Sequence, residues 1–174
     1  MSLRTYTCNN STLVIDTLGG RVHSFQTAAA GEFLFQSGDG TAHSGIPLCA
    51  PWFGKGQIGA VHPRTHGLVK HVEWEVAAET VTENEIKLEL ALSAEAVRDL
   101  PGFAGYEGLS YRLFVNAADT LQLTLQFCAD RRVSVDTAFH TYFAAPLPAD
   151  VHLAVSTHRD YVAGTEGRFS GVFQ

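Results

Sequence analysis

Strict alternation of apolar and other side chains in three segments constrains the fold of this chain more than any other feature. Successive side chains of a β-strand point to opposite faces of the sheet, so a period of two predicts half-buried strands. Weaker strand signals occupy residues 4–8, 12–16, 21–27, 32–35, 72–77 and 151–156. The apolar positions of the three strong segments are Ile86, Leu88, Leu90 and Leu92; Leu109, Tyr111, Leu113 and Val115; and Leu121, Leu123, Leu125 and Phe127.

Turn signals between these segments indicate how the strands connect. Asn, Asp and Gly pairs separate the strands at short intervals, and the only helical pattern, at residues 94–100, is ended by Pro101. Short strands with such turns predict an all-β antiparallel sandwich. No linker or repeat divides the 174 residues, so we expect a single domain over residues 1–174.

Charge and composition exclude several classes of protein. The formal net charge is −6 with scattered acidic residues, which argues against binding nucleic acid. No apolar run approaches the ~20 residues of a membrane span, so we expect no membrane partner. The three cysteines, Cys8, Cys49 and Cys128, form no CxxC pair, which favours a reducing, cytoplasmic location over a disulfide framework.

A loop rich in proline and glycine carries the first group of candidate site residues. Residues 44–56 read SGIPLCAPWFGKG and residues 63–67 read PRTHG. Such a sequence cannot continue a regular helix or a central strand, yet it contains Trp52, Phe53, Arg64 and His66. Aromatic, cationic and imidazole groups on irregular backbone are typical of a binding surface. The alternative is a structural loop whose aromatic residues plug the core.

A second candidate segment, residues 133–143, reads VSVDTAFHTYF. A regular strand here places Val133, Val135, Thr137 and Phe139 on one face. Asp136, His140 and Tyr142 then share the opposite face. A histidine beside a phenol and a carboxylate is suited to proton transfer near neutral pH. A surface histidine or a hydrogen-bonded core histidine is the alternative that the pattern leaves open.

Eight histidines raise the question of a metal site. His62 and His66 are four residues apart, but Pro63 lies between them and no glutamate follows His62, so the helical HExxH arrangement is excluded. Convergence of His62, His66 and His71 from a loop lacks a neighbouring carboxylate or cysteine, so we expect no metal.

Four motifs follow one another along the chain: GIPLCAPWFG at 45–54, HGL at 66–68, WEV at 74–76 and HTYF at 140–143. In order and spacing, across roughly residues 10–160, they resemble the aldose 1-epimerase (galactose mutarotase) superfamily, and its hexose-6-phosphate 1-epimerase branch in particular. The resemblance implies a galactose mutarotase-like supersandwich, C-terminally shortened. It also implies the interconversion of α and β anomers of an aldose, or a hexose 6-phosphate, without a cofactor.

The resemblance assigns roles to individual residues. His140 matches the catalytic histidine that protonates the sugar ring oxygen, and His66 matches the histidine that contacts the sugar beside it. Trp52 and Phe53 match the loop that lines the pocket. We place Arg64 and Lys70 at the rim, and Asp136 and Tyr142 beside His140, as further substrate-binding residues. Ring opening needs an acid at the ring oxygen and a base at the anomeric hydroxyl, which agrees with these roles.

Two departures from the family pattern concern the phosphate group. The phosphate-preferring branch has RGGIP where this chain has HSGIP at 43–47, and HGL/FAR where it has HGLVK at 66–70. One arginine is absent and the other is replaced by Lys70. A lysine meets a phosphate as a point charge but lacks the bidentate fork of arginine, so a sugar and a sugar phosphate both remain candidate ligands.

A third departure concerns the catalytic base. In longer family members the base is a glutamate near the C-terminus, and no residue here matches its motif; Asp136, Asp160 and Glu166 are the possible substitutes. We therefore keep three hypotheses: an epimerase of weak activity, a non-catalytic carbohydrate-binding domain, and a sugar-sensing subunit. An early end to the sheet would leave an edge uncovered, which predicts a homodimer.

Overall fold

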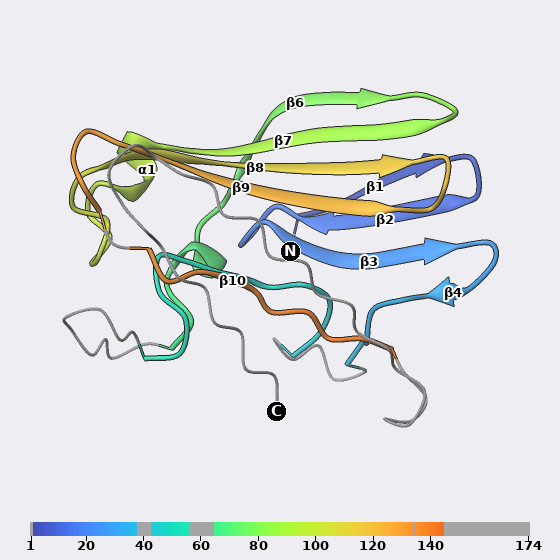
Figure 1. Ribbon diagram of the computed structural model, residues 1–174, viewed down its shortest axis with the longest axis horizontal. Coiled ribbons are helices and arrows are strands. Elements are labelled where there is room, and N and C mark those ends of the chain that lie inside the picture. The colour runs from blue at the N-terminus through green and yellow to red at the C-terminus, as the bar shows by residue number, and fades with distance from the viewer. Residues whose placement is uncertain (1, 38–42, 56–64, 134, 145–174) are drawn as a thin grey trace. The chain divides into compact units, whose positions relative to one another are not determined.

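The computed structural model describes residues 2–37, 43–55, 65–133 and 135–144 (Figure 1). Their regular structure is almost entirely antiparallel β-strand, arranged as two four-stranded sheets and one two-stranded sheet. The predicted strand at 151–156 lies outside the described residues, as do Arg64, Asp160 and Glu166.

The first four-stranded sheet has the order β1-β2-β3-β4. Its strands are β1 (Leu3–Cys8), β2 (Ser11–Asp16), β3 (Arg21–Thr27) and β4 (Gly31–Glu32). The strands predicted at 4–8, 12–16 and 21–27 are thus confirmed. β2 and β3 bury one row of apolar side chains, in which Leu13 pairs with Phe25 and Ile15 with Val22. A register shift between Val14 and Ile15 brings Val22 and Phe25, three residues apart, into this row.

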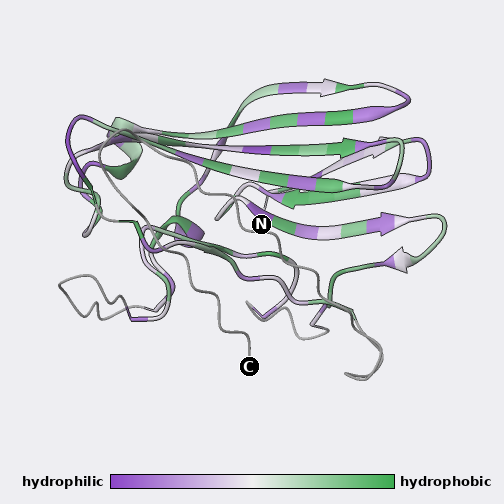
Figure 2. Ribbon diagram, in the orientation of Figure 1, coloured by the Kyte–Doolittle hydropathy of each residue, from purple (hydrophilic) through white to green (hydrophobic). Residues whose placement is uncertain are grey.

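The second four-stranded sheet contains the three strongly alternating segments. Its order is β6 (Glu75–Val81), β7 (Glu85–Ser93), β8 (Tyr106–Asn116) and β9 (Leu121–Ala129). Figure 2 shows the alternation as successive hydrophobic and hydrophilic bands along these strands. The apolar positions of β7 and β8 that the alternation predicted to be buried are at most 3% exposed. Side chains between them point outward and form cross-strand pairs such as Glu89 with Arg112.

A single hydrophobic core joins the two larger sheets. Leu13 and Ile15 of β2 belong to the same buried cluster as Ile86 and Leu90 of β7. The all-β antiparallel sandwich predicted from the alternation is therefore confirmed. The short helix α1 (Ala94–Val97) connects β7 to β8, and the Ser93 hydroxyl accepts a hydrogen bond from the Ala96 amide at its start.

Two predicted strands have different boundaries because their residues pair elsewhere. The strand predicted at 72–77 begins only at Glu75, since residues 72–74 bond to the turn between β2 and β3. Gly19 N–H donates to Val72 O, and Trp74 N–H donates to Thr17 O. The strand predicted at 32–35 ends at Glu32. There the chain turns toward the segment of the second candidate motif, where the Phe35 amide donates to Tyr142 O.

The two-stranded sheet pairs β5 (Leu48–Cys49) with β10 (Ala138–Phe139) in antiparallel orientation. The hydrogen bonds continue beyond these labels, because the amides of Asp136, His140 and Tyr142 donate to carbonyls of residues 51, 47 and 45. Every second residue of 136–142 is thereby held along the loop 45–51. A 3-10 helix, η1 (Val69–His71), follows the His66-Gly67 turn.

Candidate functional site

The ladder between residues 45–51 and 136–142 determines which side chains face the site. Its even-numbered residues share one face, as the alternation predicts, so His140 and Tyr142 lie together. The opposite face packs on the core: Phe139 stacks on Tyr111 with ring centroids 5.6 Å apart, and Val133 and Val135 also contact the core. The predicted faces are therefore confirmed for His140 and Tyr142 and for the three apolar residues. Thr137, predicted on the core face, is exposed instead and donates its hydroxyl to Cys49 O, and only Ala138–Phe139 form a regular strand.

Three rings gather around His140. The Tyr142 ring stacks on it nearly parallel, with centroids 4.7 Å apart and an interplanar angle of 19°. The His66 ring meets it edge-on at 5.3 Å, and the Phe53 ring lies 5.7 Å from His140 and 4.9 Å from His66. Two imidazoles and a phenol, each with a polar edge, are thus brought together from the loop and from the 133–143 segment.

His66 is held in an unusual backbone conformation by its neighbours. It has a φ of 65°, and the following Gly67 has a φ of 69° with its α-carbon pressed against the Ala50 backbone. The His66 amide donates to Gly54 O at 2.7 Å, and the Gly54 amide donates to His66 Nδ1 at 3.3 Å. Because Nδ1 accepts the hydrogen bond from the Gly54 amide, neutral His66 carries its hydrogen on Nε2. This Nε2–H group can donate a hydrogen bond to a ligand.

Burial lowers the pKa of His66, and the positive charge of Lys70 and the nearby imidazoles of His140 and His43 lower it further. The imidazole is therefore biased toward its neutral form. Together with the tautomer fixed by Gly54, this makes His66 a hydrogen-bond donor at neutral pH rather than a proton acceptor.

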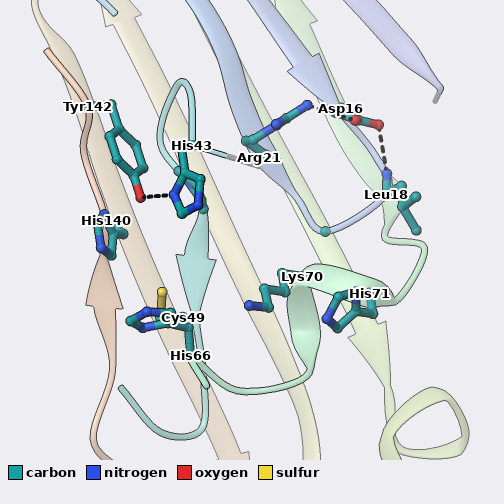
Figure 3. Close-up of a pocket in the computed structure, with 12 residues that line it drawn as sticks. Asp16, Leu18, Arg21, His43, Cys49, His66, Lys70, His71, His140 and Tyr142 are labelled. Atoms are coloured by element: carbon teal, nitrogen blue, oxygen red, sulfur yellow. Dashed lines mark hydrogen bonds and ion pairs between the residues drawn. The ribbon is translucent and has the colours of Figure 1, made fainter. Parts of the chain in front are cut away.

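A second histidine, His43, contacts Tyr142. Its Nδ1 lies 3.0 Å from the Tyr142 hydroxyl, and the two rings meet edge-on at 5.9 Å (Figure 3). Burial raises the pKa of Tyr142, and the Cys49 thiol adds to this shift, so the phenol keeps its proton at neutral pH. The interaction is then a hydrogen bond from the phenol O–H to the His43 nitrogen when that imidazole is neutral.

The opposite side of the site is charged. Arg21 Nη2 lies 3.3 Å from a carboxylate oxygen of Asp16, and both side chains are largely buried. Asp16 also accepts hydrogen bonds from the amides of Ser2 and Leu18. Lys70, from η1, donates through Nζ to Thr65 O at 3.0 Å and is among the residues that line the pocket.

These side chains surround a pocket of about 290 Å³ that opens to solvent (Figure 3). That volume is near the lower end for ligand pockets and suits a small molecule. Cys49 lies in its wall, where burial raises the thiol pKa to about 11, so the residue is no thiolate nucleophile at neutral pH. The lining residues are Asp16, Leu18, Gly19, Arg21, His43, Pro47, Cys49, His66, Lys70, His71, His140 and Tyr142.

Three of the residues predicted for the site stand apart from this lining. Trp52 is 5% exposed, and its ring packs so tightly on Gly102 that a Cβ there would lie 2.6 Å from it, which is the packing role considered as the alternative. Phe53 flanks the two imidazoles without lining the described pocket. Asp136 follows the ladder near Pro51, and among the described residues no hydrogen bond joins its carboxylate to His140.

Sequence reasoning did not assign roles in the site to His43, Asp16 and Arg21. The sequence offered one signal for His43: it stands where the phosphate-preferring branch of the family has an arginine. Asp16 and Arg21 end β2 and begin β3, and they face each other in the strand register. The β2–β3 hairpin accounts for the pairing of Asp16 with Arg21. That this pair lies near the 133–143 segment is evident only from the tertiary structure.

The arrangement can bind a polar ring and move protons. It combines hydrogen-bond donors on His66 and Lys70 with an ionisable imidazole on His140.

Within the part of the chain that the structure describes, no three side chains of His, Cys, Asp or Glu converge in the way a metal ion requires. Among these residues there is also no helix with the length and apolar character needed to cross a membrane.

The sequence profile of the aldose 1-epimerase family matches residues 4–161, so the chain belongs to this family. A search of curated protein sequences finds no significant match. Solved structures with the same fold include HI1317, at 21% identity and a TM-score of 0.62 over 81% of this chain and 49% of that one.

Two further structures extend the comparison. YeaD from Salmonella typhimurium, named as a candidate mutarotase, is 23% identical with a TM-score of 0.64, covering 81% of this chain and 48% of its own. A galactose mutarotase related enzyme from Lactobacillus acidophilus is 20% identical with a TM-score of 0.57, covering 87% and 52%. The fold is thus galactose mutarotase-like, and the chain spans about half the length of these structures.

Proposed function

We propose that this protein interconverts the α and β anomers of an aldose. The observation that carries the proposal is the meeting of His140 and His66, 5.3 Å apart at a small pocket, in a chain that belongs to the aldose 1-epimerase family. Anomerisation proceeds through opening and closing of the sugar ring. In each step the bond between the anomeric carbon and the ring oxygen breaks or forms while protons move to and from the two sugar oxygens. Imidazole groups suit such proton transfers at neutral pH.

His140 acts as the acid in this proposal. In its protonated form it donates to the ring oxygen as the bond between that oxygen and the anomeric carbon breaks. His66 supports the same reaction by donating its Nε2 hydrogen to a sugar oxygen, since Gly54 fixes its tautomer. Phe53, beside both imidazoles, offers the apolar C–H face of a sugar an aromatic surface.

The charged side of the pocket supports an anionic sugar, such as a hexose 6-phosphate, as a substrate. Lys70 lines the pocket with its ammonium group, and Arg21 also lines it while paired with Asp16. A phosphate attracted there would meet Lys70 as a point charge. Neutral aldoses remain the simpler substrate, because Asp16 already neutralises Arg21.

A non-catalytic carbohydrate-binding or sugar-sensing protein is the second candidate. It is favoured by the state of Asp16, the one carboxylate among the described lining residues, which is tied to Arg21 and two amides and so is poorly placed to accept a proton. In this case the pocket binds sugar without turnover.

Exchange spectroscopy by NMR tests the proposal. Purified protein is added to equilibrated aldohexoses and their 6-phosphates, and the exchange rate between anomeric protons is measured. We expect faster exchange than in buffer, and about 10²–10⁴-fold loss in the His140→Ala variant. Tyr6→Phe is a matched control because that hydroxyl bonds to Glu79 on β6. Saturable sugar binding with buffer-level exchange would favour the non-catalytic candidate instead.

The cysteines support a cytoplasmic location for this activity. Cys8 and Cys49 are buried free thiols and Cys128 is an exposed one. Free thiols persist in a reducing compartment, where an exposed cysteine is not oxidised.

A further inference from the structure

The acid side of anomerisation has a candidate in His140, but a proton acceptor for the anomeric hydroxyl is also needed. Asp16 is buried, and its oxygens are occupied by Arg21 Nη2 at 3.3 Å and by the amides of Ser2 and Leu18 at 3.3 and 3.2 Å. His66 presents a donor, because its Nδ1 is taken by Gly54. Among the described residues that line the pocket, the remaining groups able to accept a proton lie near His140, on the side formed by residues 43 and 142.

We propose that Tyr142 and His43 form a dyad that removes the anomeric hydroxyl proton, with Tyr142 touching the sugar and His43 accepting the phenol proton. This inference rests on the proposed epimerase function. Its basis is the hydrogen bond of 3.0 Å between Tyr142 Oη and His43 Nδ1, at the same pocket as His140 (Figure 3).

The position of Tyr142 relative to His140 suits a shared substrate. Their rings are stacked at 4.7 Å and nearly parallel, so the phenol oxygen and the imidazole edge are presented side by side. The two oxygens that exchange protons in ring opening are bonded to the same carbon of the sugar. An acid and a base for this reaction must therefore lie next to each other, as these two groups do.

The backbone fixes both members of the dyad. Tyr142 N–H donates to Gly45 O, and His140 N–H donates to Pro47 O, both at the ladder. His43 precedes Gly45 by two residues, so the same loop that anchors Tyr142 also carries the imidazole that contacts its hydroxyl. Gly45 has a φ of 66°, and a Cβ there would lie 2.2 Å from Val22 O, which restricts this turn to glycine.

The proton transfers balance as follows. The anomeric O–H gives its proton to Tyr142 Oη while the Tyr142 proton passes to His43 Nδ1, leaving a neutral phenol and an imidazolium. The electron pair of that O–H bond forms the carbonyl, the bond from the anomeric carbon to the ring oxygen breaks, and His140 protonates that oxygen. After rotation about the bond to the next carbon, the reverse transfers close the ring on the other face and restore each residue.

His43 acts through Tyr142, so it is a positioning residue rather than a catalytic one. It is exposed and lines the pocket, so a small molecule from solvent can take the place of a truncated side chain. Chemical rescue therefore provides a readout that a purely structural role would not give. Added imidazole can occupy the space left by a truncated side chain and accept the proton from the phenol.

Anomer exchange by NMR is measured for the full chain and for Tyr142→Phe, His43→Ala and the double variant, with thermal unfolding as the folding check. Tyr142→Phe keeps the ring that stacks on His140, so its fold is retained. We expect each single variant to lose about 10²-fold in kcat with little change in KM. The double variant should be no slower than the slower single one, because the two residues act as a unit. Imidazole should restore exchange in His43→Ala but not in the double variant.

The outcomes separate this inference from the function on which it rests. If exchange in the wild-type chain equals that in buffer, the proposed function fails and the dyad fails with it. If wild-type exchange is fast and His140→Ala removes it, but Tyr142→Phe and His43→Ala stay at the wild-type rate, only the dyad is overturned. The dyad would also be overturned if the losses of kcat in the two single variants multiplied in the double variant and imidazole did not restore exchange in His43→Ala.

Discussion

His66 and Gly54 are joined by two reciprocal hydrogen bonds, one from each backbone amide. The His66 amide donates to Gly54 O at 2.7 Å, and the Gly54 amide donates to His66 Nδ1 at 3.3 Å. The pair holds Gly54, the residue after Phe53, against His66 and sets the tautomer of the imidazole. A loop rich in proline and glycine is thereby made into a defined wall of the pocket.

The turn that supports this pair should not tolerate a side chain at Gly67. A Cβ there would lie 1.9 Å from Ala50 O, and the residue has a φ of 69°. We expect Gly67→Ala to lower the free energy of unfolding by about 3 kcal/mol or more, measured by chemical denaturation. Gly31→Ala is the matched control, since Gly31 has a φ of 71° with nothing within 4 Å. It should cost only about 1–2 kcal/mol of backbone strain. Equal losses in the two variants would contradict the packing argument.

The lowered pKa of His66 predicts a dependence of stability on pH. Burial, Lys70 and two imidazoles disfavour the charged form in the folded state, so the unfolded chain, with a histidine pKa of about 6.5, binds a proton more readily. The contribution of neutral His66 is complete above that value and is lost as the pH falls through and below it. The free energy of unfolding, measured from pH 7.5 to 5, should therefore fall more steeply in the wild type than in His66→Gln. Parallel curves would show that the His66 pKa is unchanged by folding.

The sequence predicted the faces of the 133–143 segment but not its pairing. Alternation placed His140 and Tyr142 together and put Phe139 on the core, because side-chain direction depends only on local backbone. The segment forms little regular strand because its partner contains Pro47 and Pro51, whose carbonyls accept hydrogen bonds but which have no N–H to donate.

Other parts of the site depend on contacts between distant segments, which periodicity cannot supply. Trp52 was predicted in the pocket from its place in the loop, yet it is buried against Gly102. His43 contacts Tyr142 because the hydrogen-bonded ladder holds residue 142 against the loop, a contact that the sequence does not indicate. The loop motif therefore indicated where the site lies, whereas the distances between side chains required the structure.

We expect the Tyr111 hydroxyl to lower the free energy of unfolding rather than raise it. The ring is fully buried and contacts Trp74 and Phe139, but the hydroxyl has no hydrogen-bond partner among the described residues. A buried polar group without a hydrogen-bond partner loses its hydrogen bonds to water, and no bond within the protein replaces them. Tyr111→Phe should therefore leave the free energy of unfolding unchanged or raise it by about 1 kcal/mol, measured by chemical denaturation. A loss above about 1 kcal/mol would indicate that the hydroxyl is satisfied, for example by a buried water molecule.

The final prediction concerns self-association through β9, the outermost strand of its sheet in the described structure. Its sequence, LQLTLQFCA, carries no charge, and its inward row, from Leu121 to Phe127, is only half-buried. Uncharged, regular edges recruit further strands, whereas the opposite edge, β6, contains two glutamates and a bulge. We therefore propose a homodimer in which β9 pairs with its copy.

Light scattering over a range of protein concentrations tests this pairing. The double variant Gln122→Lys with Gln126→Lys places positive charge on the exposed face of β9, and a two-fold pairing would bring these charges of the two copies together. We expect it to shift the equilibrium toward the monomer by at least about tenfold in the dissociation constant. Ala78→Lys, which adds a charge to β6 opposite Glu89, should leave the dissociation constant unchanged. A wild-type chain that stays monomeric at the highest concentration would contradict the proposal, and so would a dimer that β9 charges do not weaken.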